Sequence, residues 1–312
     1  MRLFLFLWIF ARAWTEELDL FPRVYSEIAD MFHPSIADLQ KIQFYFTHGQ
    51  RPILERLEDF AFVSKNFKFI GSSPDEMPEF GHLAIRCSEE ERKQCIILYA
   101  SFNRNYPAGV RRLVQRIPKT GYRGHLYYRI GGWPNIEGGD LLLSHVPFAF
   151  KICFFREMQR LGYNQVLWLD ASILPYASLN YIFSLIRRDG LFIQANTHSV
   201  SRFMNEDTAK AFGLTVLQTE NILSCSAAII GLDFTNEKTA SLIESLYEAA
   251  KDPYAFFSPR SDQTALSILL HQQGLSHLMA PANTLGALDN IQRQTLFLMD
   301  RSYVKTQEES HD

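Results

Sequence analysis

The sequence lacks the short motifs that mark the commonest metal and phosphate sites. Its 4 cysteines show no Cys-x-x-Cys spacing and no accompanying pair of histidines, which argues against a structural zinc site. The glycine-rich stretch 131–139 has neither GxGxxG nor GxxxxGK spacing, so no phosphate cradle of those two kinds is expected. The net charge is -3 and no basic stripe carries interleaved aromatic residues, which argues against a nucleic-acid partner.

Long apolar runs are also missing. The apolar stretch 3–10 follows Met1-Arg2 and precedes Ala11-Arg12-Ala13, and it falls short of the roughly 20 residues that cross a bilayer. Three interpretations of residues 1–13 stay open: a short signal peptide, an apolar helix that anchors the chain at a membrane surface, or a buried N-terminal element. A signal would direct the protein to the secretory pathway or outside the cytoplasm. Otherwise it would be cytoplasmic or membrane-associated.

Composition indicates a globular chain. It has 312 residues, of which 47% are hydrophobic and 13% aromatic, enough for a substantial core. The polar loop 71–78 is the best boundary between an N-terminal part and a main domain. We therefore expect a helical extension over 14–91, a main domain over 92–304 and a polar tail over 305–312.

From residue 94 onward, apolar runs alternate with segments of helical spacing. This order predicts an α/β fold with a mostly parallel central sheet flanked by helices. The segment 197–220 is polar and reads as an insertion or lid, and 277–281 as a short edge strand. The expected strands are 94–101, 125–130, 165–170, 191–196 and 225–232, and the expected helices are 108–117, 147–161, 178–188, 237–250 and one opened by 261–264.

The strand 165–170 ends in Asp170 and a short polar break. Ligands of such sheets bind outside the carboxyl ends of the strands, where this carboxylate would lie. An aspartate there is often only a turn former, but Ser178 is expected to cap the following helix, which leaves Asp170 without a local duty. A carboxylate at that rim suits a divalent cation or a ribose hydroxyl.

These segments resemble a known family. The runs Pro147-Phe148-Ala149-Phe150-Lys151, Leu161-Gly162-Tyr163 and 166–173 are similar to the core of nucleotide-sugar-dependent glycosyltransferases of the GT-A type. In that family the strand ends in an Asp-x-Asp motif that binds Mn²⁺ or Mg²⁺ on the donor diphosphate. Ser261-Asp262-Gln263 resembles the Asp-Gln motif that opens a later helix, and 224–231 the strand lining the acceptor side. The resemblance covers roughly 94–281 and implies a GT-A-like fold.

The second acidic position of the motif is Ser172, so the motif is degenerate. A serine hydroxyl is a weak ligand for a hard cation. Either Asp170 and Ser172 bind a metal weakly, with His277 or Asp289 recruited, or the enzyme works without metal. In the second case Lys151, Arg104 or Arg129 would neutralise the departing diphosphate, although each of these cations has the alternative of a solvated or snorkelling side chain.

Three further polar residues are candidates. Asp262 suits the first turn of a helix without any substrate, but its pairing with Gln263 makes it a candidate catalytic carboxylate. Asn196 and His198 follow the strand 191–196 at the same rim, where a donor would bind, although a histidine there is more often a turn or surface residue. Trp133 and Tyr106, in loops on that rim, are expected to stack on a ring or to cap the core.

The sequence therefore predicts a glycosyltransferase that uses a UDP- or GDP-sugar and a glycan, protein or lipid acceptor. Asp170 and Asp262 are its candidate catalytic residues, and Asp170, Ser172, Lys151, Asn196 and His198 its candidate donor-binding residues. Two alternatives stay open. One is a non-catalytic nucleotide- or carbohydrate-binding relative that lost the metal site. The other is a nucleotidyltransferase, which needs two metal-binding carboxylates close together.

Overall fold

The computed structural model describes residues 80–87, 93–100, 106–130, 143, 146, 148–252 and 254–301. The expected signal or anchor, the helical extension up to residue 79 and the polar tail lie outside these residues. Arg104 and Trp133 do as well. For these parts the sequence-based expectations stay predictions.

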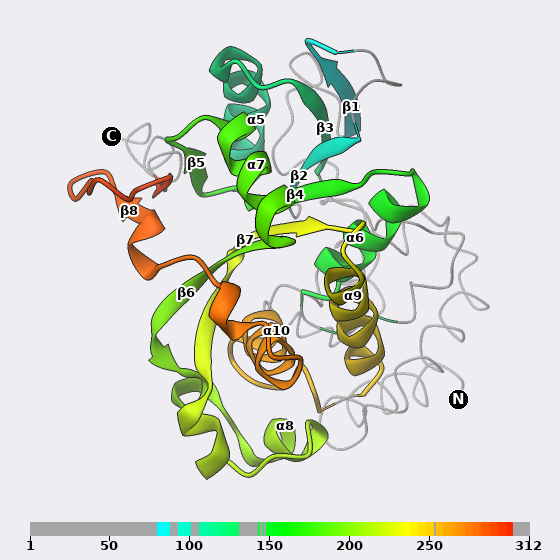
Figure 1. The fold of residues 1–312 in the computed structure, drawn as a ribbon, viewed down its shortest axis with the longest axis vertical. Helices are drawn as coiled ribbons and strands as arrows, with labels where there is room; N and C mark the ends of the chain where they lie inside the picture. The colour runs from blue at the N-terminus through cyan, green and yellow to red at the C-terminus, as the bar shows by residue number, and fades with distance from the viewer. Residues whose placement is uncertain are drawn as a thin grey trace, which may run out of the picture.

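A six-stranded sheet forms the centre of the described structure (Figure 1). The strands lie in the order β1 (Phe80–Ile85), β3 (Gly124–Ile130), β2 (Gln94–Ala100), β4 (Gln165–Asp170), β7 (Leu223–Asp233) and β6 (Leu191–Ser199). β2 pairs in parallel with both β3 and β4, whereas β7 is antiparallel to both β4 and β6. Four strands, β3, β2, β4 and β6, therefore share one direction, and the predicted mainly parallel α/β sheet is confirmed.

Helices cover both faces of this sheet (Figure 1). Alternate side chains of a strand point to opposite faces, and Trp168 accordingly packs in a different core cluster from Leu167 and Leu169. The Trp168 side packs against α6 (Phe150–Arg160), α9 (Glu237–Ala250) and α10 (Ser261–Gln272). The opposite side packs against α5 (Tyr106–Arg116) and α7 (Leu179–Asp189).

A second, three-stranded sheet brings the end of the described chain beside β4. Its order is β5 (Ile173–Pro175), β9 (Phe297–Met299) and β8 (Leu285–Ala287). β5 starts three residues after Asp170 and pairs antiparallel with β9. The remaining elements are the short helix α8 (Glu206–Ala211) and the 3-10 turns η2 (Ile117–Thr120), η5 (Val200–Phe203), η6 (Leu217–Asn221), η7 (Ser276–Leu278) and η8 (Ala282–Thr284).

Several expected boundaries shift. α6 begins at Phe150 and not at Pro147, but it does end before Gly162, whose φ of 80° suits a glycine stop. Ser178 occupies the N-cap position of α7, yet its side chain makes no capping hydrogen bond. The capping role expected for it was therefore wrong.

The sequence placed residues 80–87 in the helical extension, and this was also wrong. They contain β1, which pairs antiparallel with β3 along its whole length. Of the described side chains of β1, Ile85 alone is fully buried. Because an edge strand buries so little, it leaves no apolar run in the sequence.

The structure shows what the expected insertion 197–220 and the expected edge strand 277–281 form. β6 continues through Asn196 and His198 to Ser199, and η5, α8 and η6 then follow in turn, joined by short loops, to the end of the polar segment 197–220. In the expected edge strand 277–281, Ala280 forms a single parallel bridge to Gln194. Its amide donates to Ile193 O at 2.8 Å, and its carbonyl accepts from Ala195 N at 2.8 Å.

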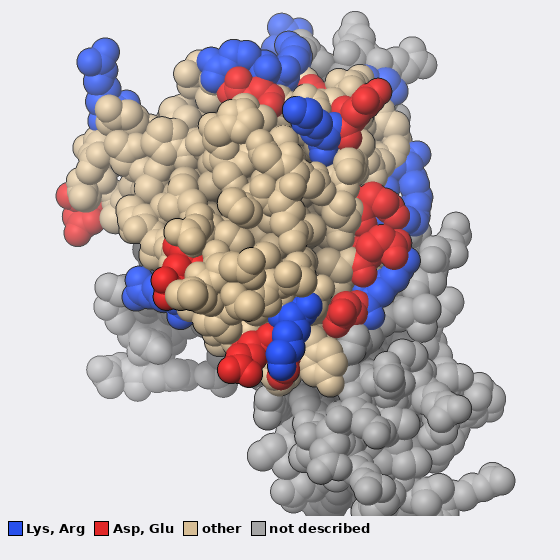
Figure 2. Space-filling model, turned by 60° about the horizontal axis from the view of Figure 1, so that its bottom comes forward, with Lys and Arg blue, Asp and Glu red and all other residues tan. Residues whose placement is uncertain are grey.

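Figure 2 shows one face of the molecule, with the bottom of Figure 1 turned forward. The described charged side chains lie around the edge of this face with both signs interspersed, and uncharged side chains fill its middle. This face therefore offers mainly uncharged surface. Among the described helices, none has the length and apolar composition that a membrane span requires.

The contact between β7 and α7 tests this packing. A Cβ added at Gly231 would lie 2.6 Å from Ile186 Cδ1. We expect Gly231→Ala to lower the free energy of unfolding by about 1–3 kcal/mol, because the overpacked helix must shift. Denaturant unfolding measures the change. Ala84→Val on the exposed part of β1 is the control and should change stability by less than about 0.5 kcal/mol. Equal effects of the two substitutions would contradict the packing described here.

Candidate functional site

A buried lysine joins two carboxylates at the carboxyl end of β4. Lys151 Nζ lies 2.8 Å from Asp262 Oδ2 and 3.3 Å from Asp170 Oδ1. The same ammonium donates a hydrogen bond to Ala227 O at 2.8 Å. Both predicted catalytic carboxylates and the predicted donor-binding residue Lys151 therefore meet in one cluster, although they lie on three separate elements.

Strand alternation explains the position of Asp170. Trp168 and Asp170 are two residues apart on β4, so they point to the same face, the one covered by α6 and α10. The Trp168 indole Nε1–H donates to Asp170 Oδ1 at 2.7 Å. Buried indoles usually need such an acceptor. Asp170 thus has a structural role as the acceptor for the Trp168 indole, which the sequence did not reveal.

The two helices contribute their first turns. Lys151 is the second residue of α6, and Asp262 is the second residue of α10. A carboxylate is favoured at a helix N-terminus and a lysine is not, because the positive end of the helix dipole points there. The ammonium of Lys151 is held there because both carboxylates compensate for this repulsion.

The side chains of Lys151, Asp262 and Asp170 differ in their exposure to solvent. The side chain of Lys151 is 6% exposed, that of Asp262 is 16% exposed and that of Asp170 is 37% exposed. Burial alone would lower the pKa of the Lys151 ammonium, but the nearby carboxylates of Asp170 and Asp262 together raise this pKa above its ordinary value. A ligand that approaches from solvent therefore meets Asp170 first, with a fixed positive charge behind it.

Two aromatic rings, those of Trp168 and Phe148, lie next to the Lys151 ammonium. Lys151 Nζ lies 5.4 Å from the centroid of the Trp168 ring and 5.6 Å from that of Phe148, distances at which a cation is attracted to a ring face. Phe148 has a φ of 63°, a left-handed conformation that a bulky residue seldom adopts. This turn leads directly into α6 and sets where Lys151 enters the site.

Gln263, Ser224 and Asn196 form a second polar group beside this cluster. Asn196 Nδ2 donates to Ser224 Oγ at 3.1 Å and to Cys225 O at 2.6 Å. Gln263 Nε2 also donates to Ser224 Oγ, at 3.1 Å. Asn196 therefore ties β6 to β7, and Gln263, next to Asp262, joins the same network. The predicted site residues did not include Ser224 or Gln263.

Among the described residues, His198, His277, Asp289 and Tyr106 make no hydrogen bond, ion pair or ring contact with Asp170. His198 lies within β6, where its ring packs edge-on against Phe203 with centroids 5.4 Å apart. His277 and Asp289 are exposed, and no group of three His, Cys, Asp or Glu side chains suited to a metal occurs among the described residues. Tyr106 is exposed at the start of α5.

Ser172, two residues after Asp170, is largely buried. It is 8% exposed, and its backbone carbonyl accepts a hydrogen bond from Asp300 N at 2.8 Å. The neighbouring β4–β5 turn is therefore packed against the second sheet. Ser172 is therefore less accessible from solvent than the side chain of Asp170, which is 37% exposed.

Arg129 lies in the same row of the sheet as Asp170. Tyr99 of β2 is paired with Arg129 of β3 on one side and with Asp170 of β4 on the other. Arg129 and Asp170 are therefore two strand spacings apart, roughly 10 Å. Arg129 Nη2 donates to the Tyr127 hydroxyl at 3.4 Å, and this hydroxyl donates to Glu157 Oε2 at 3.1 Å.

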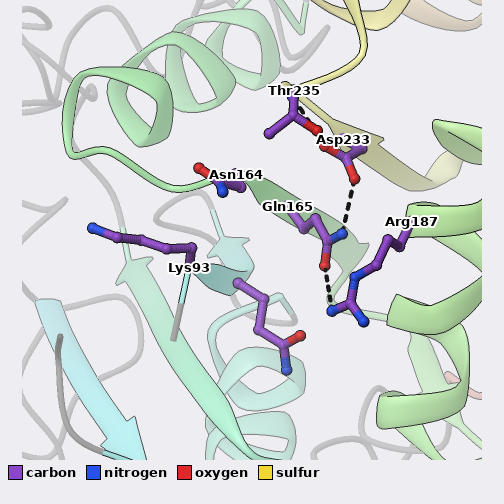
Figure 3. Close-up of a pocket in the computed structure, with 7 residues that line it drawn as sticks. Lys93, Asn164, Gln165, Arg187, Asp233 and Thr235 are labelled. Atoms are coloured by element: carbon purple, nitrogen blue, oxygen red, sulfur yellow. Dashed lines mark hydrogen bonds between the residues drawn. The ribbon is translucent and has the colours of Figure 1, made fainter. Parts of the chain in front are cut away.

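A hollow lies at the other end of β4 (Figure 3). It has a volume of about 310 Å³. Gln165 donates to Asp233 Oδ2 at 2.8 Å and accepts from Arg187 at 3.3 Å, and Thr235 donates to Asp233 Oδ1. These bonds join the start of β4 to the end of β7 and to α7. We assign the functional site to the Asp170 end, because α/β sheets bind ligands at the carboxyl ends of their parallel strands.

No protein-family model matches the chain, and neither does any curated protein. Among solved structures it is similar to the galactosyltransferase LgtC in complex with donor and acceptor sugar analogs, with 13% identity and a TM-score of 0.40 over 66% of this chain and 86% of that one. An active-site mutant of LgtC gives 11% identity and a TM-score of 0.37 over the same shares. Mouse xyloside xylosyltransferase 1 in its apo form gives 8% and 0.39 over 66% of this chain and 97% of that one.

These solved structures are glycosyltransferases. At such identities and TM-scores the likeness transfers no residue roles. The function of this chain is therefore inferred from its own side chains.

Lys151→Met tests the central ion pair. We expect it to lower the free energy of unfolding by about 3–5 kcal/mol near neutral pH, because two partly buried carboxylates lose their cation. Lys210→Met, an exposed change on α8, should cost less than about 0.5 kcal/mol. Denaturant unfolding compares the two variants with the wild type, and a Lys151→Met value as small as that of the control would refute the pairing.

The stability difference between the wild type and Lys151→Met should depend on pH in a defined way. Because the folded pKa of Lys151 is raised, its stabilising contribution is complete below the ordinary lysine pKa and is lost only as pH rises through the folded pKa. The difference in unfolding free energy between wild type and Lys151→Met should therefore hold from about pH 7 to about pH 10 and shrink only above that range.

Proposed function

We propose that the chain transfers a sugar from a nucleotide-sugar donor to an acceptor hydroxyl at the carboxyl end of β4. The observation that carries this proposal is the buried Lys151 ammonium held between Asp170 and Asp262. A polyhydroxylated, phosphorylated substrate needs acceptors for its hydroxyls and positive charge near its phosphates. The site offers two carboxylates with different exposure and one fixed cation, at the sheet edge where ligands of such folds bind. The resemblance of residues 94–281 to GT-A glycosyltransferases supports the same reaction class.

Asp170 is the residue that we expect to meet the donor. Its Oδ1 is engaged by Lys151 and Trp168, which leaves Oδ2 on the more exposed side. A fixed carboxylate oxygen there accepts hydrogen bonds from ribose or sugar hydroxyls. Asp262 lies deeper and faces the same ammonium, so we assign it to the donor sugar and to holding Lys151 in place.

A divalent metal fits this site only in one way. Mg²⁺ and Mn²⁺ prefer oxygen ligands, and Mg²⁺ is often held by one carboxylate together with substrate phosphates. Asp170 Oδ2 meets that description, whereas the buried Ser172 does not. A metal bound there would offset the negative charge of the donor diphosphate. Arg129, in the same row of the sheet, is the candidate from the protein for that task.

Turnover provides the first test. We expect Asp170→Asn to reduce donor turnover at least a hundredfold, because the fixed negative charge at the donor is lost. The variant should unfold at a lower temperature than the wild type, because Lys151 then keeps Asp262 as its one carboxylate partner, and turnover is therefore assayed below that midpoint. UDP-galactose, UDP-xylose, UDP-glucose and GDP-mannose form the donor panel, and release of the nucleoside diphosphate is measured. Ser172→Ala is the matched control and should keep wild-type turnover. An Asp170→Asn variant as active as the control would end the assignment.

Metal dependence provides the second test. Calorimetric titration with UDP and with GDP is carried out with Mn²⁺ and with EDTA. If Asp170 holds a metal together with the diphosphate, Mn²⁺ should tighten binding of the nucleotide at least tenfold, and Asp170→Ala should remove that gain while Ser172→Ala keeps it. Equal affinities in Mn²⁺ and in EDTA would assign the diphosphate charge to protein cations alone.

The non-catalytic alternative has one supporting observation, since both candidate carboxylates are paired with the Lys151 ammonium. Binding of a nucleotide-sugar without any turnover on the full panel would favour that alternative. For a nucleotidyltransferase, Asp170 and Asp262 are close enough to share one partner, but this partner is an ammonium. Its charge opposes the two metal ions that such a reaction uses.

A further inference from the structure

A clamp of two residues holds the turn that follows Asp170. Arg112 of α5 donates from Nη1 to Asp300 Oδ2 at 2.7 Å and from Nη2 to Asp300 O at 3.1 Å. Nη2 also lies 3.4 Å from Ala171 O, to which it donates. On the other side of the turn, Asp300 N donates to Ser172 O at 2.8 Å. The backbone carbonyls of Ala171 and Ser172, the two residues after Asp170, thus both accept hydrogen bonds from the clamp.

The clamp joins parts of the chain that are far apart in sequence. Arg112 and Asp300 are separated by 188 residues, and Asp300 directly follows β9, which pairs with β5. Asp300 is 9% exposed, and the side chain of Arg112 is 23% exposed. A partly buried ion pair with a forked arginine has a defined geometry, unlike an exposed pair.

Because the turn is bound at two consecutive carbonyls, the backbone of Asp170 has little freedom to rotate. Its carboxylate must keep within reach of both Trp168 Nε1 and Lys151 Nζ. In reactions that depend on alignment, displacement of a group by about 1 Å costs about a hundredfold in rate. We propose that Arg112 and Asp300 are positioning residues that fix the Asp170 carboxylate for the donor.

This inference rests on the proposed function for its effect on turnover, but the hold on Asp170 has a readout of its own. The chain contains 4 tryptophans, and the Trp168 indole N–H bonds directly to Asp170. In a ¹⁵N-labelled protein, the indole resonance of Trp168 is identified by its absence in Trp168→Phe. Movement of the Asp170 carboxylate shifts that resonance without any substrate present.

The variants are Arg112→Gln, Asp300→Asn and the double variant. Asp300→Asn retains the backbone bond to Ser172, so it tests the side-chain clamp even where Arg112→Gln impairs folding. Arg112→Lys keeps the charge but loses the fork. Arg188→Gln is the matched control, because Arg188 forms an arginine–aspartate pair with Asp189 on α7 at 2.6 Å with 69% of its side chain exposed.

We expect both single variants to shift the Trp168 resonance and to lower kcat/KM on the donor panel by about tenfold or more. The double variant should add little to either single one, because both residues serve one clamp. Arg112→Lys should recover only part of the loss, and Arg188→Gln should match the wild type in both measurements.

An unmoved Trp168 resonance, or a moved resonance with wild-type kcat/KM, overturns the inference. Failure of the proposed function looks different, since the wild type itself would then turn over no donor of the panel. In that case the resonance alone decides whether the clamp holds Asp170.

Discussion

The structure of the site depends on one buried positive charge. Lys151 lies buried at a helix N-terminus, and both burial and the helix dipole disfavour an ammonium there unless other charges compensate. Asp170 and Asp262 supply that compensation from a strand end and from the start of another helix. Their shared partner fixes where α6, β4 and α10 meet, and removal of any one of the three charges leaves the others poorly matched. The position of the candidate site and the local packing are therefore one constraint.

This arrangement gives the two carboxylates unequal roles. Asp170 is the more exposed and keeps one oxygen on the solvent side, whereas Asp262 is drawn inward toward the ammonium. In the proposed reaction, hydroxyls of the donor would donate to the fixed carboxylate of Asp170, while Arg129 or a bound metal would offset the charge of the departing diphosphate. The polar network of Asn196, Ser224 and Gln263 extends the site along β6 and β7. The positions of these groups relative to one another depend on the sheet.

The second sheet gives the end of the described chain a part in the same site. β9 pairs with β5 immediately after the Asp170 turn, and Asp300 then meets Arg112 from the opposite helix layer. Support for Asp170 thus comes from its own face through Trp168 and from behind through the clamp. Such two-sided support is what holds a reacting group to a narrow range of positions.

The local features of the site region followed from the sequence by itself. Apolar runs and helical spacing identified the strand that ends at Asp170, the helices around it and the first helical turn of Asp262, because these signals depend on neighbouring residues. The edge strand β1 was missed because it buries little. The capping role of Ser178 did not match the geometry, and a metal site at Asp170 and Ser172 stays a prediction. Only the tertiary structure decided that Lys151 points between two carboxylates and that Arg112 reaches Asp300. Contacts across long stretches of chain depend on how the layers pack, and no local pattern of residues records them.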